Sequence, residues 1–125
     1  MTKPSENELK ILQILWDHGP SSVREVHERI SENKDSGYTT TLKLMQIMAA
    51  KGIAERDTSS RTHIYSAAIS EQKTKKDLLS SFISATFKGS AASLVMQALG
   101  NADATQSELD EIKALISSIE KTNKK

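Results

Sequence analysis

The spacing of hydrophobic and polar residues over the first thirty positions predicts two helices, each opened by a capping box. Ser5 is followed three residues later by Glu8, and Ser22 by Glu25, so that each pair satisfies two free N–H groups of a first helical turn. Gly19-Pro20 lies between the pairs and ends the first helix. That helix is apolar on more than one side, which is typical of a buried helix, whereas the second carries a single apolar stripe.

A third helix is predicted over Tyr38–Lys51, which contains neither Pro nor Gly and precedes Gly52, a residue that favours the left-handed conformation of a helix end. At about 100° per residue, its positions divide into two sides. The apolar side comprises Thr41, Leu44, Met45 and Met48, and the polar side Thr39, Lys43, Gln46 and Ala50, with Thr40 and Ile47 at its edge. The polar side carries no acid, so its groups suit phosphates, base edges and thymine methyls. The alternative is an ordinary amphipathic helix whose polar side faces water.

Residues 31–36 are polar and break the pattern before the third helix. Three short helices, the last with an acid-free polar side, are typical of a helix-turn-helix domain. After Gly52 the period changes, and residues 53–57 and 62–66 predict two strands around a polar turn at 58–61. Such a hairpin is a wing that places Ser59, Ser60 and Arg61 beside a phosphate backbone or minor groove. A hairpin that only closes the core is the alternative.

The remaining residues predict three further helices, over 71–87, over 91–99, and after a third capping box formed by Thr105 and Glu108. Their apolar sides include Leu79, Phe82, Ile83, Phe87, Leu94, Val95, Leu109, Ile112, Leu115 and Ile116. A unit of about 55 residues cannot bury this much apolar surface against itself, so we expect these helices to form the interface of a two-fold homodimer. The predicted fold is mainly α, with a winged helix-turn-helix domain of three helices plus a β-hairpin wing over 1–69 and a three-helix dimerisation domain over 70–125.

Composition narrows the class of protein further. No apolar run approaches the roughly 18 residues of a membrane span, and the N-terminus has no apolar signal stretch. The chain has no cysteine, which excludes disulfides, thiolate metal sites and thiol nucleophiles. A cytoplasmic protein without a cofactor or a membrane partner fits best.

The near-equal numbers of basic and acidic residues argue against a DNA-binding protein. The chain carries 17 Lys and Arg against 16 Asp and Glu, and within residues 1–68 the two kinds balance. DNA-binding proteins usually show a basic excess, whereas here only a local patch of Lys43, Lys51, Arg56 and Arg61 is available. Affinity for DNA must then come from a few placed contacts, or from two subunits that bind together.

Several stretches of the chain match, in order, those of a known family. They are ELKILQILW at 8–16, VREV at 23–26, YTT at 38–40 with KG at 51–52, the wing strand with Arg61 and Tyr65, and FKGS at 87–90 with LV at 94–95. From about Ser5 to about Ile119 the chain resembles the penicillinase-repressor/methicillin-repressor family of bacterial transcriptional regulators, the BlaI/MecI family. The resemblance implies a winged-helix N-terminal domain, a helical C-terminal dimerisation domain, and repression through inverted repeats in promoters.

The same resemblance assigns DNA contacts to individual positions. Family members present recognition-helix contacts at the positions of Thr39, Thr40 and Lys43, with Gln46 one turn later, and Arg61 lies at the wing. Many members have an Arg where this chain has Gln46 or Ile47, and some have one at the position of Leu42. Because Arg is the commonest bidentate reader of guanine, its absence implies a different or less guanine-dependent operator.

Induction is the second point at which the chain departs from the family. The resemblance implies a sensor-linked protease as a partner, which in the drug-resistance repressors cuts an Asn-Phe bond just after the Leu-Val run. Here the aligned pair is Gln97-Ala98, which argues against cleavage at that bond and against a specific link to β-lactam resistance. Copper-responsive relatives carry a cysteine-rich metal motif, and the absence of cysteine excludes that branch.

Three rival functions remain to be compared with a DNA-binding repressor. An enzyme is not expected, because His18, His27 and His63 form no H-E-x-x-H spacing and the glycines form no phosphate loop. Metal sensing is not expected, because these histidines lie in different predicted elements. The remaining alternative is a winged helix that binds protein without specific DNA binding, which the near-neutral N-terminal half supports.

Overall fold

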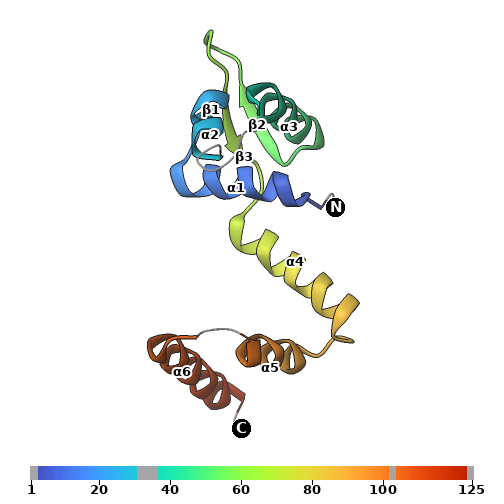
Figure 1. The fold of residues 1–125 in the computed structure, drawn as a ribbon, viewed down its shortest axis with the longest axis vertical. Helices are drawn as coiled ribbons and strands as arrows, with labels where there is room; N and C mark the ends of the chain where they lie inside the picture. Colours follow the sequence, from blue (N-terminus) through green and yellow to red (C-terminus); the bar gives the residue numbers. More distant parts are fainter. Residues whose placement is uncertain (1–2, 31–36, 102–103, 124–125) are drawn as a thin grey trace. The chain divides into compact units, whose positions relative to one another are not determined.

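The computed structural model describes residues 3–30, 37–101 and 104–123, and the described chain is mainly helical with a small antiparallel sheet (Figure 1). The elements in chain order are α1 (Glu6–His18), β1 (Ser21–Ser22), α2 (Val23–Ile30), α3 (Tyr38–Lys51), β2 (Ala54–Asp57), β3 (Ile64–Ala67), α4 (Glu71–Thr86), α5 (Ala91–Asn101) and α6 (Gln106–Asn123). The predicted fold class, a winged helix-turn-helix followed by three helices, is confirmed. The predicted break at 31–36 lies outside the described residues.

The helix ends follow the capping residues that the sequence predicts. The backbone N–H groups of Glu8, Glu25 and Glu108 donate to the hydroxyls of Ser5, Ser22 and Thr105, and each glutamate accepts from the backbone of its partner, at distances of 2.8 to 3.2 Å. Ser70 caps α4 by a single bond, its hydroxyl accepting from the backbone N–H of Lys73. Gly52 takes the left-handed conformation at φ 84° and ends α3, because only glycine adopts it without a steric penalty.

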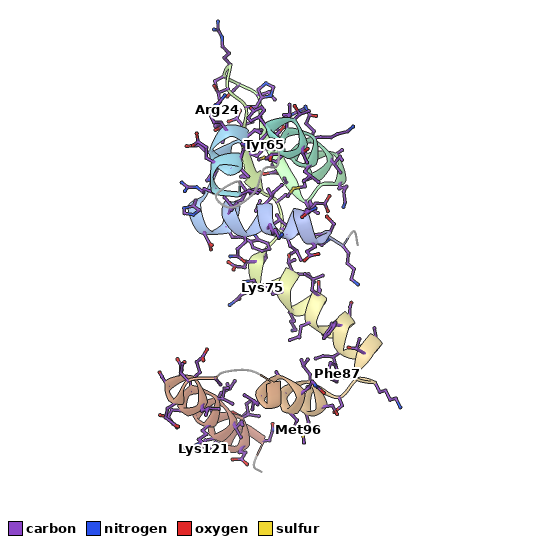
Figure 2. All side chains as sticks on the ribbon, viewed as in Figure 1. Arg24, Tyr65, Lys75, Phe87, Met96 and Lys121 are labelled. Atoms are coloured by element: carbon purple, nitrogen blue, oxygen red, sulfur yellow. The ribbon has the colours of Figure 1, made fainter. Side chains whose placement is uncertain are left out.

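The hydrophobic core of the first unit, Met1–Leu79, is built from α1, α2, α3 and the sheet. Its buried members are Ile11, Leu12, Leu15, Val23, Val26, Met45, Met48, Ile53, Ala54 and Tyr65. Tyr65 comes from the central strand and is 1% exposed, which Figure 2 shows among the elements of this unit. Trp16 packs on the same core, and its indole N–H donates to the carbonyl of Ile69 at 3.0 Å. This contact anchors the chain just after the wing to α1.

The sheet has one strand more than the two that the sequence predicts. Its order is β1-β3-β2, with Ala54 paired to Ala67 and Asp57 to Ile64 in the hairpin. The added strand β1 contains only Ser21 and Ser22, and it pairs antiparallel with β3. Two serines carry no alternation of polar and apolar residues, so sequence periodicity gives no signal for this strand.

One ion pair ties the first and third helices together. Lys51 Nζ in the last turn of α3 lies 2.7 Å from Glu8 Oε1, and Glu8 is only 3% exposed. Burial by itself raises the pKa of the Glu8 carboxyl, but the hydrogen bonds from Lys51 and Ser5 and the charge of Lys51 outweigh it, so that the pKa is lowered. Lys51 therefore belongs to the structural frame and is not a free cation of the basic patch that the sequence predicts.

The second unit, Ser80–Lys125, leaves its apolar side chains largely uncovered within one chain. None of the described side chains of α5 and α6 is buried, and Phe82 is 51% exposed although its ring contacts Phe87 edge-on at 5.9 Å. The exposed apolar side chains here and at the end of the first unit are Leu79, Phe82, Val95, Met96, Leu99, Leu115, Ile116 and Ile119. Among the described helices none alone has the length and composition of a membrane span, although α4 with the bent continuation into α5 meets that test on length and composition.

Candidate nucleic-acid interface

Helix α3 presents the polar side that its sequence predicts. Thr41, Met45 and Met48 are buried against the core, and Leu44 is half-buried. The side chains left exposed on the other side are Tyr38, Thr39, Thr40, Lys43, Gln46, Ile47 and Ala50. No carboxylate lies among them, so this side can meet a phosphate backbone without charge repulsion.

The start of α3 is fixed against α2 by contacts that the sequence does not reveal. His27 Nδ1 lies 2.9 Å from Thr41 Oγ1, and the His27 ring meets the Tyr38 ring edge-on at 5.7 Å. Thr41 is thereby a buried hydroxyl with a hydrogen-bond partner, as buried polar groups require. These contacts hold the end of α3 at which a recognition helix reaches base edges.

Arg24 is a candidate DNA contact that the sequence reasoning missed. Its guanidinium carbon lies 5.5 Å from the centre of the Tyr38 ring, within the range of a cation–π contact, and the residue is exposed on α2. Arg24 forms no ion pair within the described part of the chain. The signal available in the sequence was the spacing of Arg24 and His27, which places both on one side of α2.

The wing tip is shaped by hydrogen bonds of its own residues. The backbone N–H of Ser59 donates to Asp57 Oδ1 at 2.9 Å, and the Ser60 hydroxyl donates to the carbonyl of Thr62 at 2.9 Å. The hydrogen bonds from Ser59 lower the pKa of the exposed Asp57 carboxyl. Arg61 is exposed at the tip and enters no ion pair among the described residues. The hydroxyls of both serines are therefore engaged within the tip, that of Ser59 with the Asp57 carboxylate and that of Ser60 with the carbonyl of Thr62.

A shallow hollow of about 730 Å³ lies between the exposed side of α3 and the sheet. Gln46 and Ala50 line it from α3, and Glu55, Arg56 and Asp57 line it from β2. Because these three β2 side chains carry both signs of charge, the hollow offers no uniform site for an anion. Gln46 therefore lies at the boundary between the exposed side of α3 and this mixed surface.

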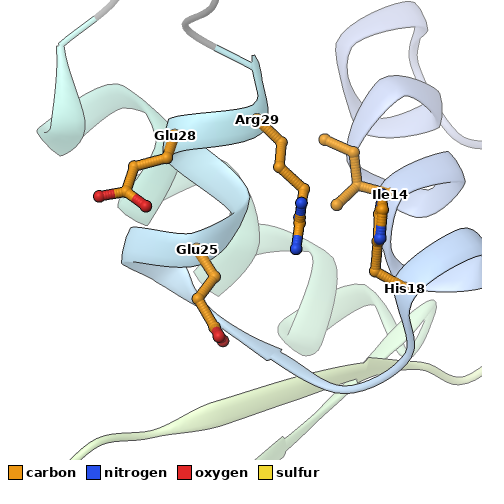
Figure 3. Close-up of a pocket in the computed structure, with 5 residues that line it drawn as sticks. All are labelled: Ile14, His18, Glu25, Glu28 and Arg29. Carbon is orange, nitrogen blue, oxygen red and sulfur yellow. The ribbon is translucent and has the colours of Figure 1, made fainter.

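A second hollow, of about 660 Å³, lies between α1 and α2 (Figure 3). Arg29 reaches from α2 toward Ile14 and His18 on α1, whereas the Glu28 carboxylate points away from them. Across residues 3–30, 37–101 and 104–123 no three histidine or carboxylate side chains gather in a way that could hold a metal ion. The acids and the histidine at this hollow therefore do not form a metal centre.

The sequence matches the profile of the penicillinase repressor family over residues 4–118. It is similar to the methicillin resistance regulatory protein MecI of Staphylococcus aureus strain N315, with 25% identity over 90% of this chain and 91% of that protein. It is similar to a penicillinase repressor of Staphylococcus aureus, with 25% identity over 91% of this chain and 90% of that protein. The transcriptional regulator BlaI of Mycobacterium tuberculosis is 32% identical over 52% of this chain and 48% of its own length.

Among solved structures, the chain resembles a MarR family transcriptional regulator from Silicibacter pomeroyi. The TM-score is 0.45 and the sequence identity 23%, with coverage of 94% of this chain and 69% of that structure.

Proposed function

The chain belongs to the penicillinase repressor family, the BlaI/MecI family, and we propose that it is a sequence-specific transcriptional repressor. In this proposal the protein acts in the cytoplasm as a homodimer on an inverted-repeat operator of double-stranded DNA. The observation that carries the proposal is the exposed, acid-free side of α3, which is held by α2 at its start and is followed along the chain by a wing with Arg61 at its tip.

In the proposed complex, α3 enters the major groove and the wing contacts the backbone. Thr39, Thr40, Lys43 and Gln46 approach base edges and nearby phosphates. Ser59, Ser60 and Arg61 hold the phosphate backbone from the wing. Arg24 adds a phosphate contact from α2, because the first helix of a helix-turn-helix crosses the backbone.

The proposed dimer covers the apolar side chains of the C-terminal helices. Its interface comprises Leu79, Phe82, Ile83, Phe87, Leu94, Val95, Leu109, Ile112, Leu115 and Ile116. Five of these residues are among the large apolar side chains that one chain leaves exposed, and exposed apolar side chains that gather in a patch mark an interaction site. A two-fold dimer presents two copies of α3, which matches a palindromic operator.

One observation favours a second function, a winged-helix module that binds protein. Ile47 and Tyr38 are each 41% exposed on the side of α3 assigned to DNA, and residues 1–68 carry no net charge. The two functions differ in their dependence on salt. DNA binding releases counterions and weakens steeply as salt rises, whereas an apolar protein interface does not.

The test is the affinity of the purified protein for the DNA upstream of its own gene. Fluorescence anisotropy would be recorded across salt concentrations, with scrambled DNA of equal length as the control. We expect salt-sensitive binding that prefers the upstream sequence, and footprinting then gives the half-site spacing. Equal and weak binding to both DNAs would reject the repressor and favour the protein-binding module.

A further inference from the structure

We infer that α3 reads A·T base pairs, with Gln46 bonded to an adenine and Ile47 packed on the methyl group of a thymine. The inference rests on the proposed function, because it assigns the bases that this DNA-binding surface recognises. It concerns only the base pairs under the middle of α3 and leaves those under Lys43 unassigned.

Ile47 is an aliphatic side chain placed among polar groups on the exposed side of the helix. It is 41% exposed although α3 buries Met45 and Met48 completely on its other side. In the major groove the thymine C5-methyl is the only apolar group on a base edge, and aliphatic side chains recognise it by contact. When α3 docks in the groove, the exposed part of Ile47 therefore meets an apolar partner on a base edge where a thymine methyl lies opposite, and a polar base edge elsewhere.

Gln46 supplies the matching polar recognition at the neighbouring position. Its side-chain amide is exposed and forms no hydrogen bond within the described part of the chain. The amide offers a donor and an acceptor side by side, which fit the N7 acceptor and the N6 amino donor of adenine. Gln46 and Ile47 therefore both favour A·T base pairs, because one recognises adenine and the other recognises thymine.

The cations of α3 limit how guanine can be read. Lys51 is engaged with buried Glu8 at 2.7 Å, and α3 contains no arginine. Lys43 is thus the one cation on the exposed side of the helix. It can serve a phosphate or one guanine, whereas the positions of Gln46 and Ile47 offer no bidentate cation for guanine.

The experiment removes single groups from the footprinted operator and measures affinity by anisotropy. Replacing one thymine at a time with deoxyuridine deletes only the C5-methyl group. We expect one position in each half-site at which this change weakens binding about three- to fivefold, the effect of one methyl group that loses its apolar contact. The Ile47→Ala variant should bind the unmodified operator more weakly and should no longer distinguish thymine from deoxyuridine at that position.

Lys10→Ala is the control, because it shortens an exposed side chain of α1 outside the proposed DNA-binding surface and should keep both the affinity and the deoxyuridine effect. In the same way, 7-deazaadenine deletes the N7 acceptor and should weaken binding by the wild-type protein but not by Gln46→Ala. Sequence-specific binding that is insensitive to deoxyuridine, or a deoxyuridine effect that survives in Ile47→Ala, would overturn the inference and leave the repressor intact. Loss of any preference for the upstream DNA would instead reject the proposed function.

Discussion

At the scale of single residues, two lysines of α3 differ in whether their charge is available to DNA. Lys51 forms an ion pair with the buried Glu8 carboxylate. Lys43 is exposed and forms no ion pair among the described residues. A chain without a basic excess depends on each free cation for its phosphate contacts. Replacing Lys43 should therefore lower the affinity for DNA, whereas replacing Lys51 should lower the stability of the fold.

Lys43→Ala should weaken operator binding about tenfold, roughly 1.4 kcal/mol, while the protein stays folded. The reason is the loss of one charge-assisted contact from the proposed groove-facing side. Anisotropy titrations would measure the affinity, and thermal unfolding would confirm an unchanged fold. Lys10→Ala, which removes an exposed lysine of α1, is the control and should bind as the wild type does. Unchanged affinity in Lys43→Ala would remove Lys43 from the site.

Lys51→Met should destabilise the protein at neutral pH by about 1–3 kcal/mol, because it leaves the Glu8 charge buried without its partner. The folded state lowers the pKa of Glu8, so the pair contributes stability above the ordinary carboxyl pKa, and that contribution is lost as the pH falls through the lowered value. Urea unfolding at pH 7 and at about pH 4 would therefore show a smaller difference between variant and wild type at the acidic pH. A difference that does not depend on pH would show that the carboxylate is not responsible.

Arg24→Gln should weaken binding to operator and scrambled DNA by the same factor, about three- to tenfold, and should reduce the salt slope by about 1. A phosphate contact carries no sequence information, which is why both DNAs respond alike. Tyr38→Ala removes the ring on which Arg24 rests, whereas Tyr38→Phe keeps it. If Tyr38 positions Arg24, the effects of Tyr38→Ala and Arg24→Gln will not add, and Tyr38→Phe will be silent. A loss confined to the operator would instead assign Arg24 to a base.

At the scale of elements, the features that could be predicted correctly from the sequence were those set by residues close together in the chain. The Ser5, Ser22 and Thr105 capping boxes each act within four residues, and all three form. The division of α3 into a buried and an exposed side follows from helical period alone and is also confirmed. Local geometry suffices for such features because their partners lie one or two helical turns away.

The contacts that the sequence did not reveal join residues that are distant along the chain or lack periodicity. Glu8 and Lys51 are 43 positions apart, and Trp16 meets the carbonyl of Ile69 across 53. Strand β1 is too short to show alternation, and the contact of Arg24 with Tyr38 depends on how α2 and α3 pack. Consequently the polar side of α3 could be assigned from sequence, whereas the free and engaged cations around it required the structure.

At the scale of the whole molecule, the two units expose different kinds of surface, and so they suit different partners. The first unit, Met1–Leu79, buries a continuous core and leaves a polar side of α3 exposed. The second, Ser80–Lys125, has half-buried and exposed apolar residues and no buried side chain among those described. Exposure of apolar side chains to water is unfavourable, and Met96, labelled in Figure 2, is 72% exposed. A second copy of the chain supplies the missing apolar surface in the proposed dimer.

Phe82→Asp should convert the protein to monomers, because a carboxylate cannot be buried in an apolar interface without a partner. Ser84→Asp adds the same charge at an exposed position on the opposite side of α4 and should leave the dimer intact. Light scattering would measure the mass of both variants, and circular dichroism would verify their helices. Since each protomer supplies one α3, the Phe82→Asp monomer should bind a single half-site weakly, with about half the salt slope of the dimer. Dimers that persist in Phe82→Asp would remove α4 from the interface, and monomers in both variants would show that charge on α4, and not the apolar side of Phe82, controls assembly.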